Sequence, residues 1–293
     1  THTRFSHSVG VAHLARTVLQ RLINKGVIYT ATGEQPLAMS PQERERLVSL
    51  ATVCGLVHDI GHAPLGHTLD RFFRTQFFEG EATSDADKEF LPRIIESLAE
   101  PIRAIDGLSI SQVKEVLAGE ESLTGWLVFL SQLVNSKLDV DRLDYLQRDA
   151  HFTGQLEGLL NIEALLSSIR PFKADGKVFL TFDESYLGDI EQFVYARDVM
   201  YLRCYEHRAK VVSEALASRA VHRLFEVVPD LRANLYFFAA LSDAQLLEVV
   251  NGLPGEEDGS PKDLFRRVFR SEALAYVEVD SIPFVKPLVG GWL

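Results

Sequence analysis

The sequence is poor in cysteine, with only Cys54 and Cys204 among 293 residues. Both are flanked by apolar, helix-like sequence, so we expect two free buried thiols rather than a disulfide framework. No apolar run approaches the roughly 20 residues that a membrane-spanning helix needs, and no secretory signal opens the chain. These absences predict a soluble protein of a reducing compartment, the cytoplasm, that has no membrane partner.

Positive charge is also scarce, since 30 Lys and Arg stand against 41 Asp and Glu, for a net charge of −11. A broad surface for nucleic-acid backbone would need a basic face, so we expect no extensive nucleic-acid surface. A small anionic ligand stays compatible with this charge, because a local basic pocket or a divalent metal can supply the positive field. The chain also lacks an initiator Met and begins almost inside a motif, so we expect upstream residues to be missing from this numbering.

Apolar residues recur mostly at helical spacing, with no internal repeat. The spacing predicts helices at 8–23, 41–58, about 89–100, 109–118, 122–150, 186–227 and from about 262. The sequence Ser40-Pro41-Gln42-Glu43 is typical of a capped helix start. Loops are expected at 26–41, 79–88 and 252–261, a small hairpin near 172–184 and a strand-like tail at 275–279. We therefore expect a mainly α core over 1–228 and a helical/β extension over 229–293.

A cluster of histidines and one aspartate occupies ten residues, H-D-I-G-H-A-P-L-G-H at 58–67. His58 and His62 share a face if the preceding helix continues that far. Adjacent His58 and Asp59 at a helix end offer one nitrogen and one oxygen ligand, which suits Mn, Fe, Zn or, less well, Mg. His7 would supply a further ligand from the first helix. Isolated histidines such as His13 are expected to be ordinary surface or core residues, but the density of this cluster favours a divalent metal site.

A second polar group lies in L-D-V-D-R-L-D-Y-L-Q-R-D at 138–149. Asp141, Tyr145 and Asp149 fall at i, i+4 and i+8 and form a stripe along one helical face. A solvated charged face is the usual structure of such a run and would account for Asp144 and Arg148. It accounts less well for a tyrosine between two aspartates on a helix with apolar residues around it.

With these segments, the sequence resembles the HD-domain deoxynucleoside triphosphate triphosphohydrolases. The matching motifs, in order over about residues 1–225, are R-F-S-H-S-V-G, V-H-D-I-G-H-A-P-L-G-H, L-D-V-D-R-L-D-Y-L-Q-R-D and A-R-D-V-M-Y-L-R-C-Y-E-H-R. The pattern H…HD…D alone marks the wider superfamily, which also holds cyclic-nucleotide and alarmone hydrolases. The third motif identifies the triphosphohydrolases more specifically than this pattern does. The resemblance implies a mainly α HD-domain helical bundle with a small β-hairpin appendage.

The resemblance also implies a role for each matching residue. It gives as ligands of a divalent metal His7, His58, Asp59 and Asp141. It makes His62 and His67 the catalytic residues, beside the α-phosphate. It assigns to phosphate and sugar binding Arg4, Arg142, Tyr145, Asp149, Arg197, Tyr205 and His207. The implied reaction cleaves a dNTP into deoxynucleoside and inorganic triphosphate, and the relatives imply a homo-oligomer.

One feature of that family is missing. Its members usually carry a His-Glu pair after the acidic loop, in which the histidine is the general acid, whereas here Asp87 and Lys88 align with the pair. A carboxylic acid such as Asp87 could donate a proton only if burial raised its pKa. Three alternatives stay open: His62 or His67 takes this role, the substrate is another nucleotide or a nucleic-acid end, or the protein is a nucleotide sensor with weak or no catalysis.

Overall fold

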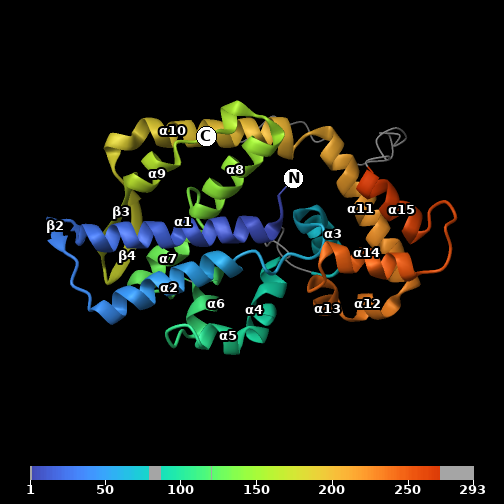
Figure 1. Cartoon of the computed structure of the whole chain (residues 1–293), viewed down its shortest axis with the longest axis horizontal. Helices are drawn as coiled ribbons and strands as arrows, with labels where there is room; N and C mark the ends of the chain where they lie inside the picture. Colours follow the sequence, from blue (N-terminus) through green and yellow to red (C-terminus); the bar gives the residue numbers. More distant parts are fainter. Residues whose placement is uncertain (1, 79–86, 120, 271–293) are drawn as a thin grey trace.

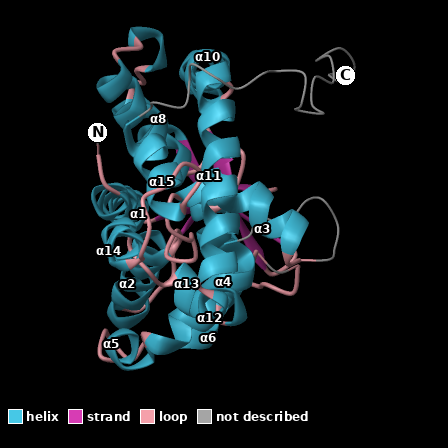
Figure 2. Cartoon of the chain, turned by 90° about the vertical axis from the view of Figure 1, so that its right-hand side faces the viewer, coloured by secondary structure: helices cyan, strands magenta, loops and turns pink. Residues whose placement is uncertain are grey.

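The computed structural model describes residues 2–78, 87–119 and 121–270, and most of them are helical, as predicted (Figures 1 and 2). The helices of the first half are α1 (Arg4–Lys25), α2 (Pro41–Val57), α3 (Asp70–Gln76), α4 (Asp87–Ser97), α5 (Ala99–Arg103), α6 (Ile110–Ala118), α7 (Trp126–Val134) and α8 (Val140–Thr153). Those of the second half are α9 (Ile162–Ser168), α10 (Leu187–Met200), α11 (Arg208–Val227), α12 (Pro229–Ala233), α13 (Leu235–Ala239), α14 (Asp243–Gly252) and α15 (Pro261–Arg270). Within the described ranges, no helix combines the length and apolar character that crossing a membrane requires.

Side-chain caps fix where α1 and α2 begin. Thr3 accepts a hydrogen bond from the backbone N–H of Ser6, so α1 starts at Arg4, four residues before the predicted start. Ser40 and Glu43 form the predicted capping box at the start of α2. The two helices pack along each other, with the start of α1 beside the end of α2 (Figure 1). Residues near both of these helix ends therefore meet in space.

The strands form one sheet with the order β2-β1-β3-β4, built from β1 (Val27–Thr30), β2 (Gly33–Pro36), β3 (Ile169–Ala174) and β4 (Lys177–Phe182). The expected hairpin is β3–β4, but the prediction of a loop throughout 26–41 is wrong. Val27 to Thr30 is rich in β-branched and aromatic residues, and Gly33, with φ of 107°, permits the tight turn to β2. Parallel pairing of β1 with β3 at Tyr29 and Phe172 then joins the two hairpins.

Two predicted long helices are interrupted. The stretch expected at 122–150 splits into α7 and α8, because the Asp139 carboxylate accepts hydrogen bonds from the backbone N–H groups of Ser136 and Arg142 and so starts a new helix. The stretch expected at 186–227 runs through a π-helical turn, η4 (Tyr201–Tyr205), and breaks at His207, which caps α11. Both breaks fall beside residues that were predicted to bind substrate. The predicted strand at 275–279 lies outside the described residues.

Two hydrophobic cores hold the helices together. The first lies among α1, α2, α6, α7 and α8. The second joins Phe73 and Phe90 of α3 and α4 to Phe225, Phe238 and Leu246 of the C-terminal helices. It also contains Ala63 and Leu69, from the segment after the His58-Asp59 pair. The predicted boundary at residue 228 stays a prediction, and this core contains residues from both sides of it.

Replacing Phe238 by alanine tests whether the second core stabilises the whole fold. Phe238 is fully buried and its ring centroid lies 5.0 Å from that of Phe225 and 5.8 Å from that of Phe73. We expect Phe238→Ala to lower the free energy of unfolding by about 3–5 kcal/mol. The neighbouring Phe237 is 54% exposed and is the matched control, with an expected loss below about 1 kcal/mol. Equal losses in urea titrations of the two variants would contradict this account of the core.

Candidate metal centre and substrate pocket

His7 lies near the start of α1 with its imidazole buried. Its Nε2 is 3.1 Å from Oδ1 of Asp141, on α8, and 3.6 Å from Oδ2 of Asp59. The other ring nitrogen, Nδ1, is 2.7 Å from Oδ2 of Asp144. The predicted ligand His7 is thus brought to two of the other predicted ligands.

His58 ends α2 and turns toward the same point. Its Nδ1 lies 2.8 Å from the carbonyl oxygen of Gly55, and because a carbonyl only accepts, Nδ1 is the donor. Nε2 is buried and has no hydrogen-bond partner among the described residues, although Asp59 Oδ1 and Asp141 Oδ1 are 3.3 and 3.4 Å away. A buried nitrogen without a partner is costly unless something binds it.

This arrangement fits a divalent metal ion. His7, His58 and Asp59 each offer a ligand atom within 4.8 Å of the others, and Asp141 adds an oxygen 3.1 and 3.4 Å from the two imidazole Nε2 atoms. Two imidazole nitrogens with carboxylate oxygens match the preferences of Mn, Fe and Zn. A cation here would also give the unpartnered Nε2 of His58 a ligand bond.

The histidines and carboxylates of the cluster shift one another's pKa values. Burial lowers the pKa of His7, but the hydrogen bonds that its ring donates to Asp141 and Asp144 outweigh burial and raise this pKa to about 10. Burial raises the pKa of Asp141, but the two histidines outweigh it and bring this pKa down to about 2. For Asp59, too, burial is outweighed by the neighbouring histidines, and its pKa is lowered. Both carboxylates are therefore ionised at neutral pH and provide the negative charge that a metal cation would neutralise.

His62 and His67 lie on the segment after α2. The helix ends before His62, so the condition under which His58 and His62 would share a helical face is not met. A turn instead brings His62 Nε2 to 3.4 Å from Asp59 Oδ1. The His62 and His67 rings are 4.1 Å apart, and His67 Nδ1 is 2.8 Å from Oδ2 of Asp70. Asp70 was not predicted, although its i+3 spacing from His67 in the sequence could have indicated it. His62, His67 and Asp70 form a second group whose geometry could hold a cation.

The predicted stripe on α8 continues from the metal cluster toward the π-helical turn η4. The Tyr205 hydroxyl donates a 2.7 Å hydrogen bond to Oδ2 of Asp149, and the ring centroids of Tyr145 and Tyr205 are 6.0 Å apart. Burial raises the pKa of both tyrosines, so each keeps its hydroxyl proton at neutral pH. We call these four residues the polar wall: Asp141, Tyr145 and Asp149 follow one another at i, i+4 and i+8 on α8, and Tyr205 of η4 contacts the last two.

The predicted phosphate-binding arginines have partners within the protein. Arg4 Nη1 donates to the carbonyl oxygens of His62 and Ala63, at 2.7 and 3.3 Å. Arg142 Nη1 donates to Oδ2 of Asp139 at 2.5 Å. Each guanidinium carries five N–H donors, so these contacts use only part of its donor capacity.

The other two predicted substrate residues differ in setting. Arg197 has a buried Nε that lacks a hydrogen-bond partner within the described part of the chain, while its Nη2 contacts Asp198 at 3.2 Å. His207 is an exposed helix cap that accepts a hydrogen bond from the backbone N–H of Ala209. Asp87 begins α4, and its side chain lies outside the described residues.

Asp144 is the residue whose place was most clearly mispredicted. A solvated charged face was expected to account for it, yet its side chain is 9% exposed and contacts His7. Arg148 donates two hydrogen bonds to the same carboxylate, at 2.8 and 2.7 Å. Sequence spacing could have shown that Asp141 and Asp144 lie on neighbouring parts of one helix face, but the partner of Asp144 comes from α1.

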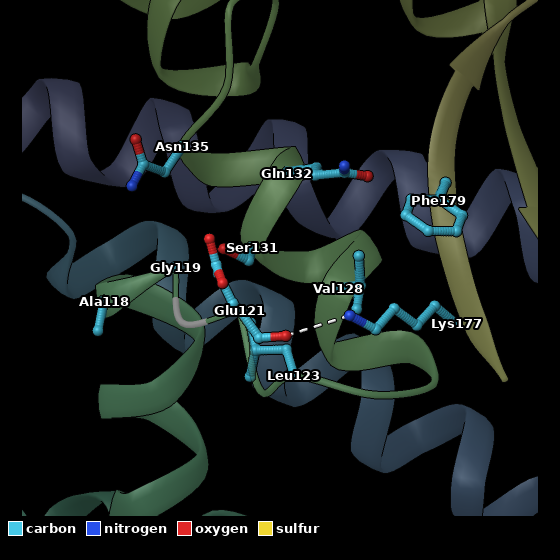
Figure 3. Close-up of a pocket in the computed structure, with 10 residues that line it drawn as sticks. All are labelled: Ala118, Gly119, Glu121, Leu123, Val128, Ser131, Gln132, Asn135, Lys177 and Phe179. Carbon is cyan, nitrogen blue, oxygen red and sulfur yellow. Dashed lines mark hydrogen bonds between the residues drawn. The ribbon is translucent and has the colours of Figure 1, made fainter. Parts of the chain in front are cut away.

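A separate cavity of about 280 Å³ lies among α6, α7 and β4 (Figure 3). Its walls carry Ser131 and Gln132 of α7, Asn135 just after that helix, and Lys177 of β4. None of the predicted metal, catalytic or substrate residues lines it. The candidate site therefore rests on the His/Asp cluster and the polar wall of α8.

Comparison with known proteins identifies the segment that carries this cluster. Residues 4–149 match the family model described as HD domain. The chain therefore carries an HD domain, and all four predicted metal ligands lie within it. An HD domain indicates a metal-dependent phosphohydrolase, which agrees with the geometry of His7, His58 and Asp59.

Several curated proteins are similar to this chain. The uncharacterized protein YwfO of Bacillus subtilis is 25% identical, over 94% of this chain and 61% of its own length. The uncharacterized MG461 homolog of Mycoplasma pneumoniae is 29% identical, over 73% of this chain and 46% of its own length. Human deoxynucleoside triphosphate triphosphohydrolase SAMHD1 is 26% identical, over 75% of this chain and 37% of its own length. The chain thus spans 61% or less of the length of these relatives.

Removing one imidazole tests the metal site. We expect the purified chain to bind Mn²⁺ or Co²⁺ and His58→Ala to lose that binding, because His58 supplies a buried, unpartnered nitrogen. Metal at 100 times its dissociation constant would stabilise the wild type by about 2.7 kcal/mol and leave His58→Ala unchanged. His13→Ala, in an exposed position on α1, is the control and should behave as wild type. Equal metal binding by His58→Ala would contradict this site.

Proposed function

We propose that this chain hydrolyses deoxynucleoside triphosphates to deoxynucleoside and inorganic triphosphate. The observation that carries the proposal is the polar wall, in which Tyr205 donates a hydrogen bond to Asp149 and packs edge-on against Tyr145, one helical turn along α8 from the predicted metal ligand Asp141. In this proposal these side chains bind the sugar, which a site for phosphate alone would not need. The similarity to SAMHD1, whose name states this activity, supports the same substrate class.

Each part of the site has a separate task in this proposal. His7, His58, Asp59 and Asp141 hold a divalent metal, which when bound lowers the pKa of water and polarises a phosphoryl oxygen. Arg4, Arg142 and Arg197 bind the phosphates, as forked donors suited to their oxygens. Tyr145 and Asp149 contact the 3′-hydroxyl and the C2′ side of the sugar, and Tyr205 holds Asp149. His207 completes the pocket wall.

Proton transfer falls to His62 and His67. The 2.8 Å contact between His67 Nδ1 and Asp70 orients that ring, and its Nε2 is the atom that would carry a proton to the leaving group. His62 lies between His67 and Asp59 and links the two clusters. This pair would replace the His-Glu pair that the sequence lacks. Homo-oligomerisation and a cytoplasmic location stay predictions.

A product assay tests the proposal. Each dNTP, along with GTP and dGMP, is incubated with Mg, Mn, Fe or Zn, and nucleoside, monophosphate and triphosphate are resolved. We expect deoxynucleoside and triphosphate in equal amounts, with activity lost in Asp141→Ala. Turnover of no dNTP under any metal would contradict the proposal, and tight nucleotide binding without turnover would identify a sensor.

A second candidate is an HD phosphohydrolase for another nucleotide or a nucleic-acid end. The observation that favours it is the sequence around Asp87 and Lys88, where the family's His-Glu pair is absent. A monophosphate product, or turnover of GTP or dGMP but of no dNTP, would establish this candidate instead.

The hydroxyl of Tyr205 gives a sharper test of sugar recognition. It donates a 2.7 Å hydrogen bond to Oδ2 of Asp149, and removing one partner of a buried hydrogen bond costs about 1–3 kcal/mol. We expect Tyr205→Phe to lower kcat/KM for dNTPs by about 10- to 100-fold, because Asp149 loses its orientation. Tyr195→Phe, on the exposed side of α10, is the control. The same kcat/KM in both variants would show that this hydrogen bond plays no part in recognition.

A further inference from the structure

We infer that Asp144 and Arg148 are positioning residues that set the orientation and the tautomer of His7 for metal binding. This inference rests on the proposed metal site. It concerns residues that contact neither the metal nor the substrate in that proposal.

The hydrogen bond between His7 and Asp144 has a definite direction. An ionised carboxylate only accepts, so His7 Nδ1 donates its proton across the 2.7 Å separation. In the neutral imidazole, the lone pair is then on Nε2, the atom that faces Asp59 and Asp141. A carboxylate behind a metal-binding histidine fixes the tautomer in this way and raises the basicity of the ligand nitrogen.

Arg148 holds the Asp144 carboxylate in place. Its Nε and Nη2 donate to the two carboxylate oxygens, at 2.8 and 2.7 Å, in a forked pair. Asp144 is 9% exposed and the Arg148 side chain 22%, so most of the pair is buried. Behind the pair, a cavity of about 460 Å³ is bounded by Leu14, Gln147 and Ile162. The guanidinium thus determines which way the carboxylate points.

The packing of α1 against α8 is also adapted to this pair. Gly10 lies on α1, one turn after His7, where a Cβ atom would stand 1.9 Å from Asp144 Oδ1 and 2.6 Å from Arg148 Nη2. Only glycine leaves room for the carboxylate and the guanidinium at this position. Two carboxylates of α8 contact the His7 imidazole, Asp141 at Nε2 and Asp144 at Nδ1.

The experiment measures Co²⁺ and Mn²⁺ affinity by calorimetry, together with the visible spectrum of the Co²⁺-loaded protein. We expect Asp144→Asn to lower metal affinity by about 10- to 100-fold and Asp144→Ala to lower it further. The Co²⁺ bands should change in both variants, because the ligand field depends on how His7 is held. Gly10→Ala should weaken metal binding in the same way while leaving Asp144 in the sequence. Asp183→Asn, which breaks the Arg170–Asp183 pair far from His7 in sequence and fold, is the matched control.

A double-mutant cycle separates positioning from general stability. We expect Arg148→Gln to lower metal affinity several-fold in the wild type and to have little further effect in Asp144→Asn, because Arg148 acts through Asp144. Metal affinity and Co²⁺ bands of a folded Asp144→Asn equal to those of the wild type would overturn the inference. If Asp144→Ala does not fold, Asp144→Asn and Gly10→Ala decide. A wild type that binds no metal would instead contradict the proposed function.

Discussion

The geometry of the candidate site depends on one buried imidazole, that of His7, held between two carboxylates of α8. Nε2 faces Asp141 and Nδ1 faces Asp144, so this one side chain bridges α1 and α8. The end of α2 approaches the same imidazole and brings His58 and Asp59 with it. Placing these charges in a partly buried site is costly without compensation. A divalent cation would offset this cost, because it neutralises the carboxylates and binds the unpartnered nitrogen of His58.

The second core explains why the segment after His58-Asp59 keeps its shape. Ala63 and Leu69 of that segment pack with aromatic side chains of α3, α4 and the C-terminal helices. Asp243, at the start of α14, accepts a hydrogen bond from the backbone N–H of Leu65, a residue with φ of 67°. The same carboxylate lies 3.7 Å from Arg4. The C-terminal helices thus help to hold His62, His67 and a predicted phosphate-binding arginine.

Much of the metal cluster and the α8 stripe could be predicted from the sequence, because both consist of unusual residue types at spacings set by a single helix or turn. Asp144 could not be placed in this way. Its partner on α1 is 137 residues away, and an acidic residue in a charged run is ordinarily solvated. The predictions for the sheet and for the start of α8 failed for two different reasons. The strand Val27–Thr30 is completed by pairing with the distant β3, whereas the side chain of Asp139 starts a new helix where apolar periodicity alone would continue the preceding one.

Anomalous diffraction from a crystal of the Mn²⁺-loaded protein would test the central claim most directly, because it locates the metal without reference to activity. The account predicts an anomalous peak at about 2.0–2.3 Å from Nε2 of His7 and His58, with oxygens of Asp59 and Asp141 completing the ligands. A peak only among His62, His67 and Asp70, or His7 bound through Nδ1, would contradict it.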